Sequence, residues 1–278
     1  MNVGPPTVAY AGGAAAHSAA AAERLFPEAA RLVALPNFAA VVGAAVEGDV
    51  GYGVLPIESS LIGPIAETHD LLWESPLSIV AETSIPIRHL LAARHRMPLE
   101  RITTVRSHPA ALDQCRRLLA SLPHARVLAA ATTAEAAADV ASSGRAGEAA
   151  IVSERAARMH GLEVLAEDVG DHPEAYTRFV SVALHTRLDG PGETWRTAFS
   201  FVTDHRAGAL VRAIEPFARH GIDLVQLVSR PIPASPWRYR FDAVLAGHPL
   251  DREVRAAFTE VRQHVRKLRV FGSYPAGA

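Results

Sequence analysis

Cysteine is almost absent from this chain. Cys115 is the only cysteine among 278 residues, so neither an internal disulfide nor a cysteine-based zinc site can form within the chain. Disulfides are typical of oxidising compartments, and their absence favours a reducing, cytoplasmic setting.

Long hydrophobic runs and charge of one sign are also lacking. No stretch reaches the roughly 18 apolar residues of a membrane span, and the alanine-rich segment 14–22 has no Lys or Arg before it, unlike a signal peptide. The 28 basic and 29 acidic residues give a net charge of -1, with no block of like charge that could follow a phosphate backbone. We therefore expect a cytoplasmic protein with neither a membrane nor a nucleic acid as partner.

Apolar sequence is abundant, at 49% of the residues, and at roughly 150 residues per domain the length suggests about two domains. From residue 7 to about 184, short apolar runs alternate with alanine-rich helical segments, which predicts an α/β region with a mostly parallel sheet. The predicted strands are 7–10, 53–55, 103–106, 126–130 and 149–152. The predicted helices are 37–47, 65–73, 109–119 and 133–141.

A Gly- and Pro-rich segment, 188–194, interrupts this pattern and reads as a linker. After it, strands and helices are expected in the order βαββαβ, which indicates a ferredoxin-like module. Its predicted elements are 197–203, 208–220, 223–229, 239–246, 251–265 and 268–272.

Four polar clusters stand at the ends of the predicted elements of the first region. They are Glu58, Ser59 and Ser60 in PIESS; Ser107 and His108 in SHPAAL; Thr132 and Thr133 in ATTAEAA; and Tyr176, Thr177, Arg178 and Phe179 in DHPEAYTRF. Turns that open helices present free N–H groups and a positive helix end, so several of them favour a small anionic ligand. Taken singly, Glu58 is equally a solvated turn acid and His108 a structural histidine.

In this order and spacing, the clusters resemble the motifs of prephenate dehydratase. The C-terminal segments AGAL at 207–210, SRP at 229–231 and GSYP at 272–275 resemble the ACT regulatory domain of the same enzymes. The resemblance implies a two-lobed, periplasmic-binding-protein-like catalytic region at 7–184, with lobes at 7–81 plus 162–184 and at 82–161. It further implies a linker at 185–196 and a ferredoxin-like ACT domain at 197–275.

The resemblance also implies a function, namely conversion of prephenate to phenylpyruvate with loss of water and carbon dioxide. Thr177 would contact the leaving hydroxyl, with Glu58 as a second catalytic residue, and no metal or organic cofactor is required. The implied substrate-binding residues are Ser59, Ser60, Ser107, His108, Thr132, Thr133, Arg178 and Phe179. Phenylalanine would be the effector of a homodimer or homotetramer, bound by Ala207, Gly208, Ala209, Leu210, Ser229, Arg230 and Pro231.

The chain departs from the family pattern at several positions. The segment 10–17 lacks the hydroxyl residues of the first family motif, and Ser59, Pro64, Ala175 and Val228 replace asparagine, serine, asparagine and glutamate respectively. These departures leave two alternatives open. One is a divergent enzyme that acts on prephenate or arogenate, and the other is a catalytically silent amino-acid sensor.

Overall fold

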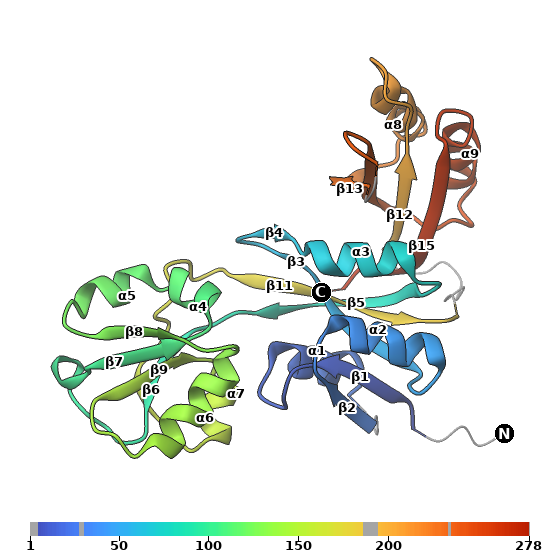
Figure 1. Ribbon diagram of the computed structural model, residues 1–278. Coiled ribbons are helices and arrows are strands. Elements are labelled where there is room, and N and C mark those ends of the chain that lie inside the picture. Colours follow the sequence, from blue (N-terminus) through green and yellow to red (C-terminus); the bar gives the residue numbers. More distant parts are fainter. Residues whose placement is uncertain (1–4, 28–30, 186–193, 233–234, 278) are drawn as a thin grey trace.

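The computed structural model describes residues 5–27, 31–185, 194–232 and 235–277. Two α/β lobes lie side by side, and a third, C-terminal domain stands on the first lobe (Figure 1). Most of the predicted linker, 186–193, lies outside the described residues.

The first lobe is built on a sheet in the order β2-β1-β3-β11-β5, with the short β4 paired to β3. Its strands are β1 (Thr7–Ala11), β2 (Arg31–Leu35), β3 (Tyr52–Ser59), β4 (Gly63–Pro64), β5 (Ser78–Pro86) and β11 (Tyr176–Ala183). Its helices are α1 (His17–Leu25), α2 (Phe38–Glu47) and α3 (Ala66–Glu74). The late strand β11 runs antiparallel between β3 and β5, so it completes the sheet from far along the chain.

The second lobe has a five-stranded sheet in the order β10-β6-β9-β7-β8. Its strands are β6 (Leu90–Ala93), β7 (Thr104–Ser107), β8 (Arg126–Ala129), β9 (Glu148–Val152) and β10 (Glu163–Ala166). Its helices are α4 (Pro109–Asp113), α5 (Arg116–Ser121), α6 (Thr133–Ser143) and α7 (Glu154–Met159), with a 3-10 turn at Leu99–Arg101. The chain crosses between the lobes twice, after β5 and before β11 (Figure 1).

In each sheet one strand, β11 in the first and β6 in the second, runs antiparallel to both of its neighbours. The other main strands of each sheet share one direction, as expected of a mostly parallel sheet. The expected lobe boundaries shift, since β5 continues to Pro86 and β10 pairs with β6 in the second lobe. The strands β6 and β10 have only four residues each, which is too short for the alternation on which the prediction relied.

Two helices of the first region begin at a side-chain cap. The Asn37 side chain accepts a hydrogen bond from the N–H of Ala40 at 2.8 Å, and Thr132 does the same for Glu135 at 2.9 Å. The helix predicted at 109–119 is instead two short helices, because the chain turns at Gln114 and Cys115.

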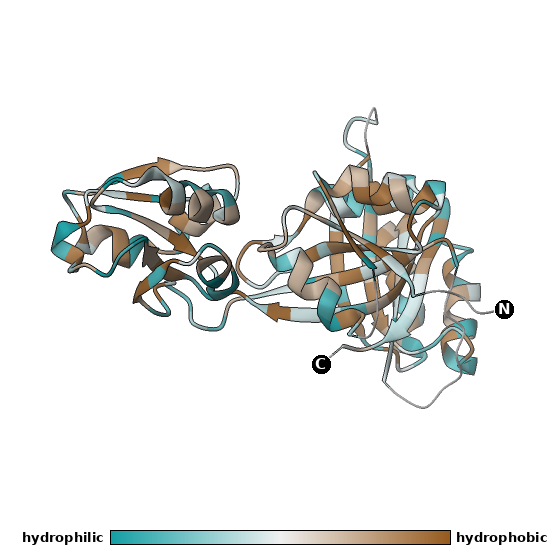
Figure 2. Cartoon of the chain, turned by 90° about the horizontal axis from the view of Figure 1, so that it is seen from below, coloured by the Kyte–Doolittle hydropathy of each residue, from teal (hydrophilic) through white to brown (hydrophobic). Residues whose placement is uncertain are grey.

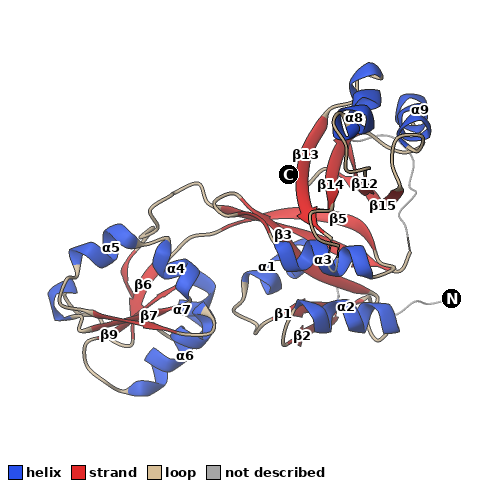
Figure 3. Ribbon diagram, turned by 45° about the horizontal axis from the view of Figure 1, so that its top comes forward, coloured by secondary structure: helices blue, strands red, loops and turns tan. Residues whose placement is uncertain are grey.

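The C-terminal domain has the predicted βαββαβ order (Figure 3). Its elements are β12 (Trp195–Val202), α8 (Ala209–Arg219), β13 (Leu224–Pro231), β14 (Tyr239–Ala246), α9 (Arg252–Val261) and β15 (Lys267–Pro275). The strands form an antiparallel sheet in the order β13-β14-β12-β15, which is the ferredoxin-like arrangement. Because β12 begins at Trp195, the last two residues of the expected linker 185–196 belong to the sheet.

This sheet is buried on both faces. Phe199 and Phe217 pack between the sheet and helices α8 and α9, while Phe271 and Tyr274 belong to the core of the first lobe. Figure 2 shows hydrophobic residues both on the strands and on the helices that pack against them. At Gly272, an added Cβ would lie 2.2 Å from the carbonyl oxygen of Ile79, so β15 packs backbone against backbone on β5. The C-terminal domain and the first lobe therefore share one continuous core.

Within the described ranges, every helix is too short or too polar to cross a lipid bilayer.

Candidate active site

A cavity of about 370 Å³ lies between the two lobes. The first lobe contributes the loop after β1, the end of β3 and the start of β11, and the second lobe contributes the starts of α4 and α6. The predicted site residues that line it are Ser59, His108, Thr132, Thr133 and Thr177.

Ser59 and Thr177 form the first-lobe wall of this cavity. They are direct partners in the antiparallel pair of β3 and β11, so their side chains emerge on the same face of the sheet. Thr177 is half-buried, and the Ser59 hydroxyl accepts the N–H of Leu61 at 3.3 Å. Two hydroxyl groups thus face the cavity from neighbouring strands.

The second-lobe wall consists of two helix starts. His108 precedes α4, and its Nδ1 accepts the N–H of Ala110 at 3.2 Å, so in the neutral ring Nε2 carries the proton and can donate. Thr132 caps α6 with its hydroxyl, and Thr133 and Ala134 line the cavity with the first turn of the helix. This wall therefore offers hydrogen-bond donors to a ligand.

Four further polar residues line the cavity that sequence reasoning missed: His17, Ser18, His89 and Gln114. The His89 Nε2 lies 2.9 Å from the Gln114 Oε1 and donates to it, which leaves the Gln114 amide N–H groups available. The sequence would indicate Gln114 only if the break between α4 and α5 were predicted, because in one continuous helix its side chain would point away from the cavity. His17 opens α1 directly after the altered first motif.

The cavity wall is mostly apolar, and hydroxyl, imidazole and amide groups supply its polar side-chain atoms. Among the described residues that line it, there is no Arg, Lys, Asp or Glu. Burial, together with a smaller effect of the nearby His89, lowers the pKa of His17 to about 4, so His17 is neutral at pH 7. Positive potential must then come from helix ends. The start of α1 has no side-chain cap, and its first residues line the cavity together with those of α6.

Glu58 and Arg178 do not line this cavity, which corrects the expectation that they contact the substrate. Strand β3 continues through Ser59, and side chains alternate along a strand, so Glu58 points to the face opposite Ser59. Arg178 lies directly across from Glu58, with its Nη1 3.5 Å from the Glu58 Oε2. Both side chains point toward the C-terminal domain.

Three more expected contacts have structural roles instead. The Ser107 hydroxyl is fully buried and donates to the carbonyl of Ile151 at 2.6 Å, which joins β7 to β9. Phe179 is buried in the core beneath α1. The Ser60 hydroxyl accepts the N–H of Tyr176 at 2.9 Å and fastens the ends of β3 and β11.

The departures from the family pattern fall in different places. Ser59, Ala175 and the glycines of the first motif, Gly12 and Gly13, line the cavity and make its wall less polar. Pro64 is exposed in β4 and is not part of the lining, so the loss of a serine there removes no contact in the cavity.

The predicted effector residues lie on two elements of the C-terminal domain. Gly208 has a φ of +74° and caps α8, whose first residues are Ala209 and Leu210. The carbonyl of Ala207 accepts a hydrogen bond from Arg212 at 3.2 Å. On β13, Ser229 and Pro231 are exposed, whereas Arg230 is turned toward the first lobe.

Arg230 therefore has a different role from the expected one. Its Nη2 lies 2.7 Å from the Oδ2 of Asp70 on α3, so it bridges two domains instead of lining an effector site. Val228 stands between Gln226 and Arg230 on the same face of β13.

Among the residues that the structure describes, no group of three or more His, Cys, Asp or Glu is arranged to hold a metal ion.

Known proteins resemble this chain in both sequence and structure. A family model described as prephenate dehydratase matches residues 8–187. "Arogenate dehydratase/prephenate dehydratase 2, chloroplastic" of Arabidopsis thaliana is 34% identical over 277 residues, which cover 96% of this chain and 72% of the relative.

Two solved structures resemble the whole chain. The prephenate dehydratase of Arthrobacter aurescens in complex with L-Phe has a TM-score of 0.88 and 29% identity, covering 97% of this chain and 90% of that one. A structure described as GqqA, a novel type of quorum quenching acylases, has a TM-score of 0.86 and 28% identity, covering 97% of each chain. The similarity thus extends over both lobes and the C-terminal domain.

Proposed function

This chain belongs to the prephenate dehydratase family, and from that membership we propose that it converts prephenate to phenylpyruvate, water and carbon dioxide. The carboxylate on the ring leaves as carbon dioxide, and its bonding electrons enter the ring. The 4-hydroxyl then departs with a proton as water, and the ring becomes aromatic. Aromatisation supplies much of the driving force, so the protein must bind a dianion and assist the leaving hydroxyl.

The strongest support comes from the pairing of Thr177 with Ser59 at the cavity wall. Thr177 is the residue that matches the family's catalytic threonine, and it is one of two hydroxyl groups on facing strand positions. An uncharged hydroxyl there would hydrogen-bond the departing oxygen. Because the strands are rigid elements of the first sheet, the hydroxyl would be held in place before the substrate arrives.

The side-chain carboxylate of prephenate would be bound by N–H groups. The starts of α1 and α6 both reach the cavity, and the positive end of a helix stabilises an anion there. Gln114 and His108 add side-chain donors. Without a fixed cation, the departing carboxylate is poorly solvated, which favours its loss as neutral carbon dioxide.

Prephenate fits the cavity better than arogenate. Arogenate carries an ammonium group in place of the side-chain keto oxygen, and a buried ammonium needs a nearby carboxylate. No Asp or Glu is among the described residues that line the cavity. We therefore propose prephenate as the preferred substrate.

The proposal includes regulation by phenylalanine at the C-terminal domain. The relative from Arthrobacter aurescens was solved with L-Phe, and Gly208 places an uncapped helix start in the segment 207–210. Ser229 would complete the site, in a homodimer or homotetramer. An assembly is supported by β13, an edge strand on which Val225 and Leu227 are each 40% exposed. The single, buried Cys115 supports a cytoplasmic setting.

The test is to incubate the purified protein with prephenate and to measure phenylpyruvate and carbon dioxide separately. Formation of both products supports the proposal. Carbon dioxide without phenylpyruvate indicates a decarboxylase that does not aromatise, and neither product indicates an amino-acid sensor. Parallel reactions with arogenate and with an N-acylated amine test the altered-substrate and acylase activities.

Variants at Thr177 test the assigned role. Thr177→Ala removes the hydroxyl and is expected to lower kcat by at least 100-fold, about 2.7 kcal/mol, with an unchanged thermal midpoint. Thr177→Ser keeps the hydroxyl and should retain more activity. Thr259→Ala, on the exposed face of α9, is the matched control. A Thr177→Ala enzyme with near-normal kcat would show that this hydroxyl does not assist the leaving group.

A further inference from the structure

Two residue pairs lie back to back on the strands β3 and β11. Ser59 and Thr177 face the cavity, and the next pair along, Glu58 and Arg178, emerges on the opposite face. The backbone of Glu58 is bonded directly to that of Ser59, so a force on the Glu58 side chain acts on the cavity wall.

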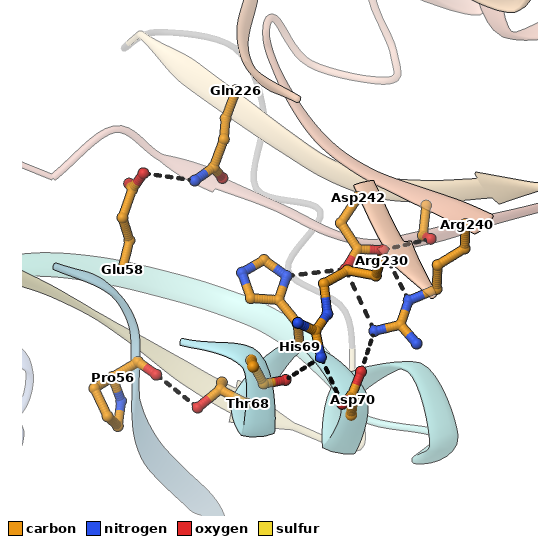
Figure 4. Close-up of polar contacts among 11 residues, drawn as sticks. Pro56, Glu58, Thr68, His69, Asp70, Gln226, Arg230, Arg240 and Asp242 are labelled. Carbon is orange, nitrogen blue, oxygen red and sulfur yellow. Dashed lines mark hydrogen bonds and ion pairs between the residues drawn. The ribbon is translucent and has the colours of Figure 1, made fainter. Parts of the chain in front are cut away.

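Glu58 is held from the C-terminal domain by Gln226 of β13. The Gln226 Nε2 donates to the Glu58 Oε1 at 2.7 Å (Figure 4). Arg178 approaches the other carboxylate oxygen at 3.5 Å. Glu58 and Arg178 are each 27% exposed, so both groups are only partly in water. A hydrogen bond to a carboxylate is stronger than one between neutral groups. The Glu58 carboxylate is thus fixed between its own lobe and the neighbouring domain.

Strands β13 and β14 together hold the first lobe at a second point. Arg230 and Arg240 share the carboxylate of Asp70 on α3, at 2.7 Å each (Figure 4). From α3, the Thr68 hydroxyl donates to the carbonyl of Pro56 on β3 at 2.6 Å. Both connections from the C-terminal domain therefore end on β3, within three residues of Ser59.

We infer that Gln226 is a positioning residue for the catalytic strand pair and acts through Glu58. In this arrangement the C-terminal domain sets the place of the Ser59 hydroxyl relative to Thr177. A ligand that shifts β13 changes that place, and turnover changes without any contact between ligand and cavity. The inference rests on the proposed function, because it concerns the same cavity and the same C-terminal ligand.

Ser229 makes β13 a suitable carrier of this effect. It is exposed on one face of the strand, and Gln226 and Arg230 contact the first lobe on the other. A change at the exposed face therefore needs to move only one strand. Coupling of this kind is reciprocal, so substrate in the cavity must change the affinity for the ligand by the same factor.

The direct test is Gln226→Met, which keeps the length of the side chain and removes the hydrogen bond. We expect kcat for prephenate to fall at least three-fold while KM stays within two-fold, because Gln226 is not part of the cavity lining. Inhibition by saturating phenylalanine should weaken at least five-fold, with phenylalanine binding by calorimetry retained. The matched control is Gln263→Met, an exposed glutamine of the same domain.

A double-mutant cycle tests whether Gln226 acts through Glu58. If it does, Glu58→Gln and the double variant should have the same kcat within two-fold. If the fold-loss of kcat in the double variant equals the product of the losses in the two single variants, the inference is overturned. Unchanged kcat and unchanged inhibition in Gln226→Met, even with a lower thermal midpoint, would show that the contact only docks the domain and would also overturn it.

Hydrogen exchange separates this inference from the proposed function. A wild-type protein that makes no phenylpyruvate contradicts the proposed function alone. In that case the amides of β3 are compared without ligand, and we expect at least five-fold faster exchange in Gln226→Met, with β8 of the second lobe unchanged. Equal exchange in β3 would overturn the role of Gln226.

Discussion

Arg155 of α7 and Glu23 of α1 form a two-pronged ion pair across the two lobes. The Nη1–Oε2 and Nη2–Oε1 distances are 2.6 and 2.8 Å, and the Arg155 Nε donates to the carbonyl of Ala14 at 2.6 Å. Ala15, next in the chain, is buried in the core of the second lobe. The altered first motif thus reaches across the cavity and is fastened there.

Arg155→Ala is expected to loosen this closure. KM for prephenate should rise about three- to ten-fold with a smaller change in kcat. The reason is that part of the binding free energy is then needed to close the lobes. The cost in stability should be at most about 1 kcal/mol, since Glu23 is 48% exposed. Steady-state kinetics beside Arg158→Ala, an exposed arginine of the same helix, provide the measurement. Equal KM values in both variants would contradict this role.

Asp242 makes the interface between the C-terminal domain and the first lobe sensitive to acid. It accepts hydrogen bonds from Ser200 at 2.6 Å, His69 at 3.0 Å and Arg240 at 3.2 Å. Burial alone would raise the pKa of Asp242, but the hydrogen bonds from His69 and Ser200 and the charge of Arg240 outweigh it and lower the pKa. Its stabilising effect is therefore complete above the unfolded pKa of about 3.9 and is lost as the pH falls through the lower folded pKa.

We expect Asp242→Asn to lower the free energy of unfolding at pH 7 by about 3 kcal/mol, because the buried Arg240 then keeps only the partly exposed Asp70 as a charged partner. Below pH 4 the difference from the wild type should shrink, as the wild-type carboxylate also becomes neutral. Urea unfolding at pH 7 and at several values between 4.5 and 3 measures both effects. Asp113→Asn, on an exposed residue, is the control. A difference that stays constant over this range would contradict the assignment.

Gly272→Ala should separate the C-terminal domain from the first lobe. The new methyl would clash with the Ile79 backbone, and the φ of +149° at Gly272 is strained for any other residue. We expect a loss of about 3 kcal/mol or more in stability and faster proteolysis between the domains. Gly43→Ala, on α2 with open space around it, should instead leave stability equal or higher.

The Cys115 thiol should be inert in the folded protein. It is fully buried in the second lobe, and burial, with the Asp171 carboxylate, raises its pKa to about 12. A thiol reagent at pH 8 should therefore react only after denaturant is added, with one equivalent per chain. Because Cys115 is the single thiol, the rate in the absence of denaturant would report local opening of that lobe. A fast reaction of the folded protein would contradict its burial.

The arrangement of domains could be predicted from the sequence because the residues that indicate each element lie close to it in the chain and agree with one another. The caps at Asn37 and Thr132 and the order of elements after residue 195 depend on near neighbours in the chain. The strands β5, β6 and β10 were missed, because they are held by pairing with distant segments rather than by a pattern of their own.

The candidate site was predicted in part. Ser59, His108, Thr132, Thr133 and Thr177 line one cavity as expected. Glu58 and Arg178 were assigned to the substrate by the family resemblance, which matches positions in the chain and not the direction of a side chain. Once the strand is known to include Ser59, alternation alone puts Glu58 on the other face. Gln226 gave no local signal, since its partner is 168 positions away in the chain.

The place of β11 in the first sheet has a consequence for synthesis. The strand fits between β3 and β5, yet the ribosome makes it only after the whole second lobe, whose sheet is complete at Ala166. At about 5–20 residues per second, the stretch from Pro86 to Tyr176 takes on the order of 5–20 s. During that time β3 and β5 have unpaired edges while the second lobe can already fold. The nascent chain is thus exposed to aggregation through these strand edges for an interval set by the length of its second lobe. Slow codons within that lobe would prolong the interval.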